Sequence, residues 1–477
     1  MKVPMKKQLF IAGQWVDAER HTQLTAPYSG EPLAEIPVAT ESEADSAIQA
    51  ASDARRMMAA MPAHKRYAIL ERVSGLLEER KEEAARIIAL EAAKPVTTAR
   101  GEVTRTIETY RFSAEEAKRL TGEMIPMDAA ASGENRIGYT MRLPLGVVGA
   151  ITPFNFPLNL VAHKVGPALA AGNTVVLKPA SQTPLSAFFI AELFAAAGLP
   201  PGALNVITGS GSTVGHALVT DPRIHKITFT GSAAVGMEIL RLTGMKKVTL
   251  ELGSNSAVIV DAGTDPEKIA RRCVTGAFSY QGQVCISVQR IYVHHSLYQP
   301  FLEALIQHTK NLKAGDPLSD DTDFSSMISS SERDRLTGWI SEALADGASV
   351  ACGGMVERGM LLPTILTGTS PTLKIACQEA FGPVVLVNPV DSVGEAVQHV
   401  NDSRFGLQAG IYTDNIHTAL RAASELQVGG VMVNDIPTYR VDHMPYGGVK
   451  DSGTGREGVP WAIREMTETR LVVLNRD

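Results

Sequence analysis

Hydrophobic side chains in the first 120 residues recur with the period of an α-helix. In residues 67–90 they lie three or four positions apart, with charged residues between them. This pattern is typical of a helix that packs one face on a core. Similar stripes predict helices at residues 42–61, with Ser42 as the expected N-cap, and at residues 99–120; residues 10–16 resemble a short strand. The helices in this part of the chain are therefore expected to pack around another part of the protein.

From residue 146 onward, short apolar runs alternate with helical patterns. Runs that are typical of buried strands occur at residues 146–151, 174–178, 204–208 and 226–230. Helix-like and strand-like segments continue at residues 265–280, 290–293, 299–312, 332–346 and 384–387. One of the helices is expected to begin at Thr183, as its cap, with Pro184 in its first turn. Repeated βα units predict an α/β fold with a doubly wound parallel sheet, in which ligands bind at the carboxyl ends of the strands.

Two strand-like pieces, residues 122–142 and 469–474, have no local partner. The first alternates polar and apolar side chains after a turn at residues 132–135. Because an exposed strand edge needs a partner, we hypothesise that these pieces form a sheet that joins copies of the chain.

Composition and charge narrow the function classes. At 477 residues the chain is too long for one compact core, so two or three domains are expected. A net charge of −6, without a Lys/Arg stripe interleaved with aromatics, argues against nucleic-acid binding. The longest apolar run, residues 187–197, is too short to span a membrane, and the apolar patch at residues 9–12 is too short for a signal peptide. We expect a cytoplasmic protein with no membrane partner.

The four cysteines lie far apart and lack C-x-x-C spacing. This disfavours a zinc site or a disulfide framework, and the histidines show no metal-ligand spacing, so no metal is expected. Cys273, Cys352 and Cys377 are interpreted as core residues. Cys285 differs because it lies in a weakly structured segment flanked by glycine and glutamine.

Three residues have side chains suited to carbonyl chemistry. Glu251 ends an apolar run and meets a glycine, so its carboxylate can activate water at a strand end. The Cys285 thiol can attack a carbonyl, although an arbitrary cysteine is more often a small buried hydrophobe. Asn155 lies in a loop bounded by prolines, T-P-F-N-F-P, and a rigid amide can stabilise an oxyanion. An asparagine that serves a turn is the alternative.

Two strand ends have features of nucleotide binding. Lys178 ends an apolar strand and can reach ribose hydroxyls or a phosphate, although a lone lysine is usually a solvated surface group. Gly231 and Ser232 begin a helix, where free backbone N–H groups can bind a pyrophosphate. The G-x-G-x-x-G spacing is absent, and turns need glycine in any case, so each stretch alone is weak support.

Together, six motifs carry a resemblance that no single one establishes. They occur in order between residues 152 and 384: T-P-F-N-F-P, K-P-A-S-Q-T-P, F-T-G-S-A-A-V-G, L-E-L-G-S-N, G-Q-V-C and Q-E-A-F-G-P-V. The chain resembles the aldehyde dehydrogenase superfamily over nearly its whole length. Among its members it looks nearest to the lactaldehyde and non-phosphorylating glyceraldehyde-3-phosphate dehydrogenase branch.

The resemblance implies a role for each motif. Cys285 is the expected nucleophile, Glu251 the general base, and Asn155 the oxyanion donor, with the backbone N–H of Cys285 as a second donor. The residues expected to bind the cofactor are Thr152, Pro153, Lys178, Ser181, Gly231, Ser232, Glu379 and Phe381. The implied reaction is oxidation of an aldehyde through a Cys285 thioester that water hydrolyses, without a metal.

The resemblance also implies the domain organisation. A Rossmann-like, doubly wound cofactor-binding domain is expected at residues 1–120 and 144–252, and an α/β catalytic domain at residues 253–449. Residues 121–143 and 462–477 are expected to form a small β extension that builds a homodimer or homotetramer.

One departure from the family pattern concerns the cofactor. Ser181 stands where NAD-preferring members often have glutamate. A carboxylate there repels a 2′-phosphate, whereas serine does not, and Lys178 is nearby to attract one. We expect NADP to be accepted beside NAD.

The substrate is expected to be a small polar aldehyde, anionic ones included. Arg105 matches a segment in which the branch places an anion-binding arginine, and Arg440 and His443 are expected near the tunnel mouth. Surface salt bridges are the alternative for both arginines. Phosphate-handling members have arginine just before the nucleophile, where this chain has Val284, so a phosphorylated substrate is less favoured.

Two other functions stay open. A coenzyme A-acylating semialdehyde dehydrogenase shares the chemistry, but such relatives typically lack the acid at the position of Glu251. A non-catalytic dinucleotide-binding protein on the same fold would have no need of Cys285, Glu251 and Asn155 together.

Overall fold

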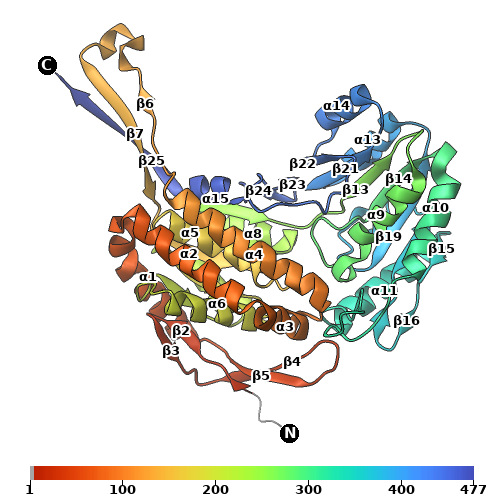
Figure 1. Cartoon of the computed structure of the whole chain (residues 1–477), viewed down its shortest axis with the longest axis horizontal. Coiled ribbons are helices and arrows are strands. Elements are labelled where there is room, and N and C mark those ends of the chain that lie inside the picture. Colours follow the sequence, from red (N-terminus) through yellow and green to blue (C-terminus); the bar gives the residue numbers. More distant parts are fainter. Residues whose placement is uncertain (1–4, 477) are drawn as a thin grey trace.

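Two large β-sheets organise the protein in the computed structural model, which describes residues 5–476 (Figure 1). The ends of the predicted terminal segments, residues 1–4 and 477, lie outside the described residues. The first sheet has the strand order β24-β12-β11-β8-β9-β10-β2-β3. Its five central strands run parallel, as predicted: β8 (Val147–Ile151), β9 (Thr174–Lys178), β10 (Leu204–Val206), β11 (Ile224–Thr230) and β12 (Lys247–Glu251). Antiparallel strands close its edges: β24 (Gly453–Thr454), β2 (Leu9–Ile11) and β3 (Gln14–Val16).

Helices cover both faces of the first sheet. Val148 and Ala150 of β8 belong to a core that includes the helices α2 (Ala63–Glu79), α3 (Lys81–Ala92), α4 (Val96–Ala117), α5 (Asn159–Ala170), α6 (Leu185–Ala196) and α15 (Val459–Glu465). Val147 and Ile151 belong to the opposite core, with α1 (Glu41–Ala60), α7 (His216–Thr220) and α8 (Ala233–Leu242). Successive strand residues therefore pack on opposite faces, which explains why these strands read as continuous apolar runs.

The second sheet has the strand order β15-β18-β19-β14-β13-β21-β22. Its strands are β13 (Ala257–Val260), β14 (Arg290–His294), β15 (Ser349–Cys352), β18 (Thr364–Thr367), β19 (Val384–Val390), β21 (Gln408–Tyr412) and β22 (Gly430–Val433). The helices beside it are α9 (Pro266–Phe278), α10 (His295–Lys310), α11 (Ser330–Ala345), α12 (Lys374–Cys377), α13 (Val393–Asn401) and α14 (Ile416–Glu425). The second sheet falls within the predicted catalytic residues 253–449, and the first sheet, except for β24, within the predicted cofactor-binding residues. The domain boundaries themselves stay a prediction.

The two strand-like pieces without local partners pair with each other. Strand β25 (Thr467–Asn475) runs antiparallel to β7 (Arg136–Pro144) along its whole length, and β6 (Met124–Ile125) adds a third strand. This sheet projects from the body of the molecule as an arm (Figure 1). Smaller sheets pair β1 (Met5–Lys6) and β4 (His21–Thr25) with β5 (Pro32–Pro37), β16 (Val356–Glu357) with β17 (Met360–Leu361), and β20 (Phe405–Gly406) with β23 (Val449–Lys450).

Two predicted elements near the N-terminus are wrong in detail. Residues 10–16 form a hairpin, not one strand, because Ala12 (φ 52°) and Gly13 (φ 78°) make a left-handed turn. The first helix is capped at Thr40, not Ser42. The backbone N–H and the hydroxyl of Thr40 both donate to Glu43, at 2.6 and 2.7 Å, in a capping box that begins two residues earlier than expected.

The structure differs from the prediction at the starts of two further helices. The stripe over residues 67–90 is two helices, because Arg80 leaves helical geometry (φ −110°, ψ 25°) between α2 and α3. Thr183 does not cap α6. Instead Glu91, from α3, accepts hydrogen bonds from the N–H groups of Leu185 (2.7 Å) and Ser186 (3.0 Å). The cap of α6 therefore comes from a distant part of the chain.

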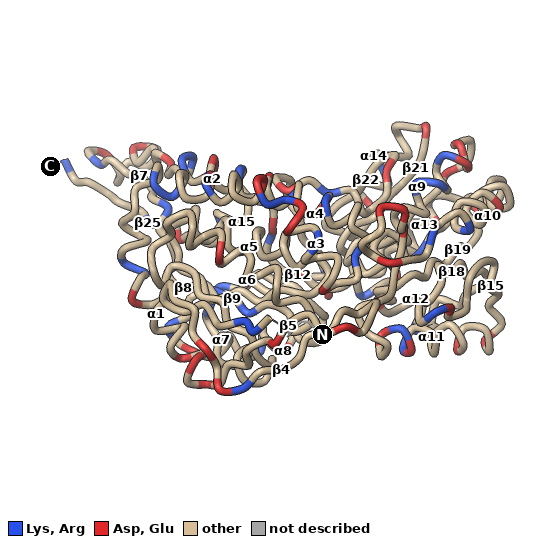
Figure 2. Tube along the Cα trace, turned by 60° about the horizontal axis from the view of Figure 1, so that its bottom comes forward, with Lys and Arg blue, Asp and Glu red and all other residues tan. Residues whose placement is uncertain are grey.

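Charges of both signs are interspersed along the described chain (Figure 2). Within residues 5–476, no helix combines the length and the apolar character that crossing a membrane requires.

Candidate active site

A cavity of about 360 Å³ lies at the carboxyl ends of the first sheet's strands and faces the loop before β14. Its lining includes eight of the residues predicted from the sequence: Pro153, Asn155, Gly231, Ser232, Glu251, Cys285, Glu379 and Phe381. These residues come from segments far apart in the chain. The cavity therefore lies where the strand-end rule predicts a ligand site, although Thr152, Lys178 and Ser181 are not among its lining residues.

Glu251 is the last residue of β12 and is 3% exposed. Neither of its carboxylate oxygens has a hydrogen-bond partner within the described part of the chain. Burial, reinforced by the charge of Glu457, raises the pKa of Glu251 well above its ordinary value, although Arg440 and Lys164 oppose this. In its ionised form, the carboxylate has no hydrogen-bond donor from the described protein on its oxygens, so it can accept a proton from a water molecule inside the cavity.

The loop that leads to Cys285 has an unusual backbone. Tyr280 (φ 48°), Gln281 (φ 53°) and Gly282 (φ 67°) are consecutive left-handed residues. The Tyr280 hydroxyl donates to the carbonyl of Ala92 (3.1 Å), and the Gln281 amide donates to the carbonyl of Ala93 (3.0 Å). A side chain at Gly282 would collide with the carbonyl oxygen of Gly382, 2.2 Å away from its Cβ position. Strained backbone of this kind persists only where surrounding contacts hold it, commonly at functional sites.

The Cys285 thiol is partly buried and contacts one polar side chain. Its Sγ lies 2.9 Å from the hydroxyl oxygen of Tyr446. Burial raises the pKa of Cys285 to about 11, and the hydrogen bond with Tyr446 opposes that rise. At neutral pH the resting sulfur is therefore mostly a thiol.

Asn155 lies in the loop between β8 and α5. Its side-chain amide donates to the carbonyl of Gln283 (3.0 Å), close in sequence to Cys285. An amide NH₂ has two donors, so this contact orients the group and leaves a second N–H. The ammonium of Lys94 donates to the Asn155 carbonyl (2.6 Å) and pairs with Glu102. This contact fixes the backbone of the loop. Both of these charged side chains are fully buried.

Three of the predicted nucleotide-binding residues lie at the ends of neighbouring strands. Lys178 ends β9 and donates to the carbonyl of Pro179 (3.3 Å), and burial lowers its pKa. Ser181 follows and is exposed. Ser232 begins α8 and accepts from the N–H of Val235 (3.5 Å). Strands β9 and β11 flank β8, so these groups face one edge of the sheet.

Thr152, Glu379 and Phe381 are three further residues that the resemblance assigns to the cofactor, and the last two line the cavity. The hydroxyl of Thr152, just beyond β8, is buried and has no partner in residues 5–476. Glu379 accepts from the N–H of Ser254 (2.9 Å), and burial raises its pKa to about 7. Phe381 packs edge-on against Phe154, with ring centroids 5.7 Å apart. Unpartnered polar groups beside aromatic rings suit a nicotinamide ribose and ring.

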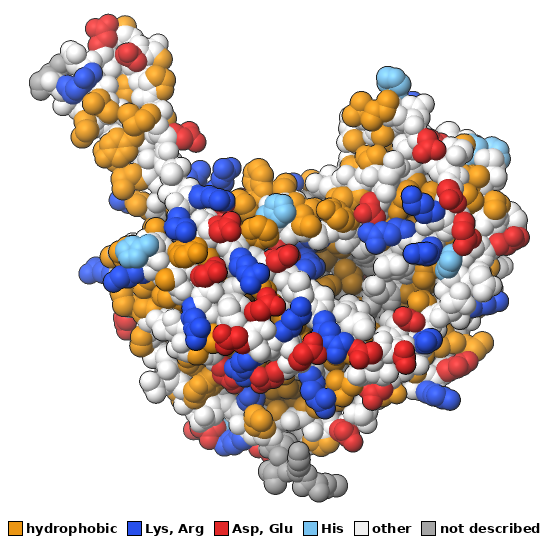
Figure 3. Space-filling model, in the orientation of Figure 1, with side chains coloured by type: hydrophobic (Ala, Val, Ile, Leu, Met, Phe, Trp, Pro, Cys, Tyr) orange, Lys and Arg blue, Asp and Glu red, His pale blue; other side chains and the backbone are white. Residues whose placement is uncertain are grey.

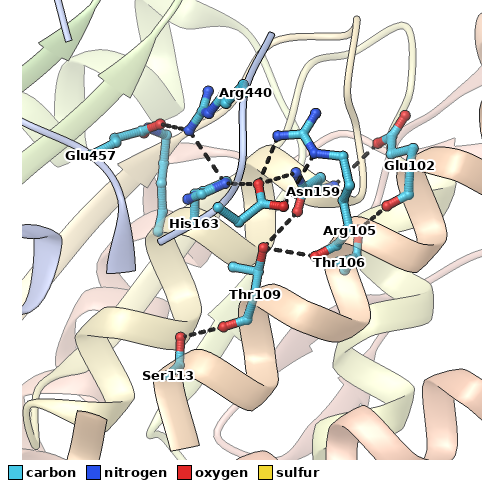
Figure 4. A network of polar contacts seen from close by, with 11 residues as sticks. Glu102, Arg105, Thr106, Thr109, Ser113, Asn159, His163, Arg440 and Glu457 are labelled. Atoms are coloured by element: carbon cyan, nitrogen blue, oxygen red, sulfur yellow. Dashed lines mark hydrogen bonds and ion pairs between the residues drawn. The ribbon is translucent and has the colours of Figure 1, made fainter. Parts of the chain in front are cut away.

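A network of charged and polar side chains includes Arg105, His163, Arg440 and Glu457 (Figure 4). Arg440 and Glu457 act on the pKa of Glu251, which lines the cavity. Asp442 is at the centre of the network and contacts Arg105 (2.7 Å), His163 (2.7 Å) and Asn159 (3.1 Å). Burial acts to raise the pKa of Asp442, but His163 and Arg105 together lower it below its ordinary value. Arg440 contacts His163 (3.3 Å) and Glu457 (3.1 Å) on the other side.

The structure brings together two of the three predicted substrate residues. Arg105 contacts Asp442, and Arg440 contacts His163, which pairs with the same carboxylate (Figure 4). Both form ion pairs, with Asp442 and Glu457, but the Nε of Arg440 is buried without a partner among the described residues. None of the three predicted substrate residues is part of the cavity lining. His443 is also exposed and packs on the ring of Phe112 (4.9 Å between centroids).

Several site residues were missed by the sequence reasoning. Lys164 pairs with Glu457 (2.8 Å), and both are buried beside Glu251. A lysine inside the otherwise apolar run L-V-A-H-K-V-G was a signal that could have been noticed. Tyr446 lies in the run P-Y-G-G-V-K-D-S-G, which is part of the family resemblance, whereas Glu457 carries no such local signal.

No group of three or more His, Cys, Asp or Glu side chains in the described chain is arranged to hold a metal ion. All four cysteines are free. Cys273 is buried in the core, as predicted, whereas Cys352 and Cys377 are only partly buried.

A cavity at the carboxyl ends of a parallel sheet, lined by Cys285, Glu251 and Asn155, is typical of an α/β enzyme that binds its ligands at the strand ends. The sequence model of the aldehyde dehydrogenase family matches residues 15–472, and the chain belongs to that family. It is 46% identical over 467 residues to a 3-sulfolactaldehyde dehydrogenase of Priestia megaterium, which covers 98% of both chains. It is 38% identical over 471 residues to a lactaldehyde dehydrogenase of Methanococcus aeolicus, which covers 98% of this chain and 100% of the relative.

Solved structures agree with this assignment. Aldehyde dehydrogenase 21 from Physcomitrella patens, in complex with the reaction product succinate, superposes with a TM-score of 0.97 and 41% identity over 99% of each chain. NADP-dependent glyceraldehyde-3-phosphate dehydrogenase from Bacillus halodurans, complexed with NADP, has a TM-score of 0.97 and 38% identity over 99% of this chain and 100% of that one. The predicted fold class and family branch are confirmed.

Proposed function

We propose that the protein oxidises small polar aldehydes, anionic ones included, to their carboxylates with NADP or NAD. The observation that carries the proposal is that Cys285, Glu251 and Asn155, from three separate elements, line one cavity. A thiol, a base and an amide donor in one enclosed space are the parts that acyl chemistry on an aldehyde needs.

In this proposal the ionised sulfur of Cys285 attacks the aldehyde carbon. The developing oxyanion accepts hydrogen bonds from the side chain of Asn155 and the backbone N–H of Cys285. When bound, the nicotinamide supplies the hydride acceptor. Glu251 then takes a proton from a water molecule that attacks the thioester carbon, and the carboxylate product leaves as the sulfur is restored. Acyl transfer to coenzyme A is not favoured, because Glu251 lines the cavity.

We infer that the first sheet and its helices bind the dinucleotide. Lys178 is positioned to bind the adenosine ribose, Ser232 the pyrophosphate, and Glu379 with Phe381 the nicotinamide half. Ser181 is exposed beside Lys178 and has no carboxylate to repel a 2′-phosphate. The similar enzyme from Bacillus halodurans is complexed with NADP, which supports NADP as a cofactor here.

The two arginines favour an anionic group on the substrate. The buried, unpartnered Nε of Arg440 is a donor without an acceptor, and leaving such a donor unpaired costs free energy. Similar proteins are named for 3-sulfolactaldehyde, a sulfonate, and for lactaldehyde, and a third is bound to succinate. Val284 precedes the nucleophile, so the proposal favours carboxylate or sulfonate over phosphate.

We also propose that the protein forms homodimers or homotetramers through its β arm. Apolar side chains gather on the arm surface (Figure 3); the exposed ones are Met124, Ile125, Met141, Leu471, Val473 and Leu474. Helix α8 and the turn after it expose Val235, Met237, Leu240, Leu242 and Met245. Patches of this kind mark protein interfaces. The proposed location is the cytoplasm, where the free thiols stay reduced; cell fractionation tests it.

Replacing Glu251 tests the reaction. In Glu251→Gln, a first turnover of reduced nicotinamide should still form, while the steady-state rate falls about 10²-fold or more, because a general base contributes that much. Glu251 works in its deprotonated form and burial raises its pKa, so the wild-type rate should rise with pH above neutrality. Stopped-flow and steady-state absorbance measure both. An unchanged steady-state rate, or product formation that depends on coenzyme A, contradicts the proposal.

Replacing Arg105 tests the substrate class. In Arg105→Gln the KM for succinate semialdehyde and 3-sulfolactaldehyde should rise about tenfold or more, since a charge-assisted hydrogen bond contributes about 1.5–3 kcal/mol. The KM for propanal should change little. Arg100→Gln is the matched control, because Arg100 lies on the same helix but pairs with Glu82 and Asp320. Equal effects on charged and uncharged aldehydes, or a wild-type preference for benzaldehyde, count against this class.

Adding a carboxylate at residue 181 tests the cofactor. Ser181→Glu should lower kcat/KM for NADP at least about tenfold through repulsion of the 2′-phosphate, with a smaller change for NAD. Gln182→Glu, which adds the same charge one residue further along, is the control. Steady-state kinetics with both cofactors measure the ratio. A wild-type enzyme that prefers NAD a hundredfold would show that Ser181 does not admit NADP.

Charging the arm tests the assembly. The double variant Leu471→Lys, Val473→Lys should sediment as a smaller species than the wild type in analytical ultracentrifugation, because lysine opposes burial of the arm. Leu344→Lys, at an exposed leucine on α11, is the control and should leave the assembly unchanged. A monomeric wild type refutes the oligomer.

A further inference from the structure

Tyr446 occupies a position in which its hydroxyl points at the sulfur of Cys285. The residue is 2% exposed. Its backbone is held by two hydrogen bonds with Glu457, N–H to carbonyl in both directions, at 3.1 and 2.7 Å. Its side chain packs with Ile286 and Leu407 in a small apolar cluster that also includes Cys285. The ring is therefore fixed, and the hydroxyl has a defined direction.

The contact between the two side chains is short. The hydroxyl oxygen of Tyr446 lies 2.9 Å from Sγ. While the sulfur carries its proton, either atom can donate. Once the sulfur is a thiolate it can only accept, so the hydroxyl of Tyr446 must then be the donor. Hydrogen bonds to ionised acceptors are about twice as strong as neutral ones.

A cation lies on the face of the same ring. The guanidinium carbon of Arg440 is 3.7 Å from the ring centroid of Tyr446, and Glu457 anchors that guanidinium at 3.1 Å. A cation at this distance is attracted to the π face. By drawing electron density toward itself, it makes the phenol O–H a stronger donor.

We propose that Tyr446 is a further catalytic residue, whose hydroxyl donates a hydrogen bond to the Cys285 thiolate and so stabilises and orients the nucleophile. This rests on the proposed role of Cys285. In the step itself the S–H bond breaks, the electron pair stays on sulfur, and the proton leaves to water in the cavity. Tyr446 keeps its own proton throughout.

The surroundings agree with a donor that does not ionise. Burial raises the pKa of Tyr446 well above its ordinary value, so the phenol stays protonated. The other titratable or charged groups near the sulfur are Arg440, Glu379 and Glu251. Of these, Arg440 favours the thiolate and the two carboxyl groups oppose it. Tyr446 is the group that contacts the sulfur directly.

The test uses the whole protein without cofactor or aldehyde. Alkylation of Cys285 by iodoacetamide, followed at the level of the Cys285 peptide by mass spectrometry, reports thiolate formation as a function of pH. In Tyr446→Phe the apparent pKa of Cys285 should rise by about one unit or more, because a charge-assisted hydrogen bond is lost. Alkylation at pH 8 should then slow about tenfold, with the same limiting rate at high pH.

Two further variants make the outcome decisive. Tyr412→Phe is the matched control, since Tyr412 is also buried and its hydroxyl has no partner among residues 5–476; it should behave as wild type. Incorporating 3-fluorotyrosine at position 446, a nearly isosteric and more acidic phenol, should lower the apparent pKa of Cys285. An unchanged pKa in both Tyr446 variants overturns the proposal. If wild type oxidises aldehydes and Cys285→Ala does not, the proposed function survives that result.

Discussion

Burial of charge around one cavity is the constraint on which the rest of the site depends. Removing an ionised group from water is costly unless a partner and hydrogen bonds replace the solvent. Lys94 has Glu102, Lys164 has Glu457, and Asp442 has Arg105. Glu251 has no such partner. These three pairs compensate buried charge, whereas the Glu251 carboxyl at the cavity has no direct partner, and burial raises its pKa instead.

The ion pairs also fix backbone. Glu102 accepts from the N–H groups of Leu158 and Asn159, while Lys94 holds the carbonyl of Asn155. The loop that presents the Asn155 amide is thus fastened at both ends to a pair that solvent cannot reach. On the other side, the left-handed turn before Cys285 is tied to the end of α3 through Tyr280. The loop of Asn155 and the turn before Cys285 are both hydrogen-bonded to the chain near the end of α3. These contacts fix the separation between the two backbone segments.

What the sequence predicted correctly follows local rules. Apolar runs that end in Lys178 and Glu251 are central parallel strands, and their ends meet at one edge of the sheet. The motifs around Asn155 and Cys285 identified the chemistry because the family pattern is dense there. Two errors, the cap at Thr40 and the turn at Ala12 and Gly13, are local; the other failures share one cause. The cap of α6 is Glu91, the break at Arg80 interrupts an unbroken stripe, and the surroundings of Cys285 include Tyr446: each depends on a contact between distant residues or on geometry that periodicity does not encode.

The charge balance of the network supports the proposal of an anionic substrate. Arg105, Arg440 and Lys164 are linked through contacts to two carboxylates, Asp442 and Glu457. Burial lowers the pKa of His163, so this residue adds no charge at neutral pH. Three cations against two carboxylates give the network a net formal charge of +1.

The net positive charge of the network affects the pKa of the Cys285 thiol. An anion placed near the sulfur raises the pKa of the thiol by repulsion, so a substrate carboxylate or sulfonate works against formation of the thiolate. In the proposed function, Arg440 offsets this rise in the pKa. Its positive charge attracts the substrate and also strengthens the hydrogen bond from Tyr446 to the sulfur. In the proposed function, one buried positive charge, that of Arg440, therefore serves both recognition of the anion and activation of the thiol, which offsets the free-energy cost of its burial.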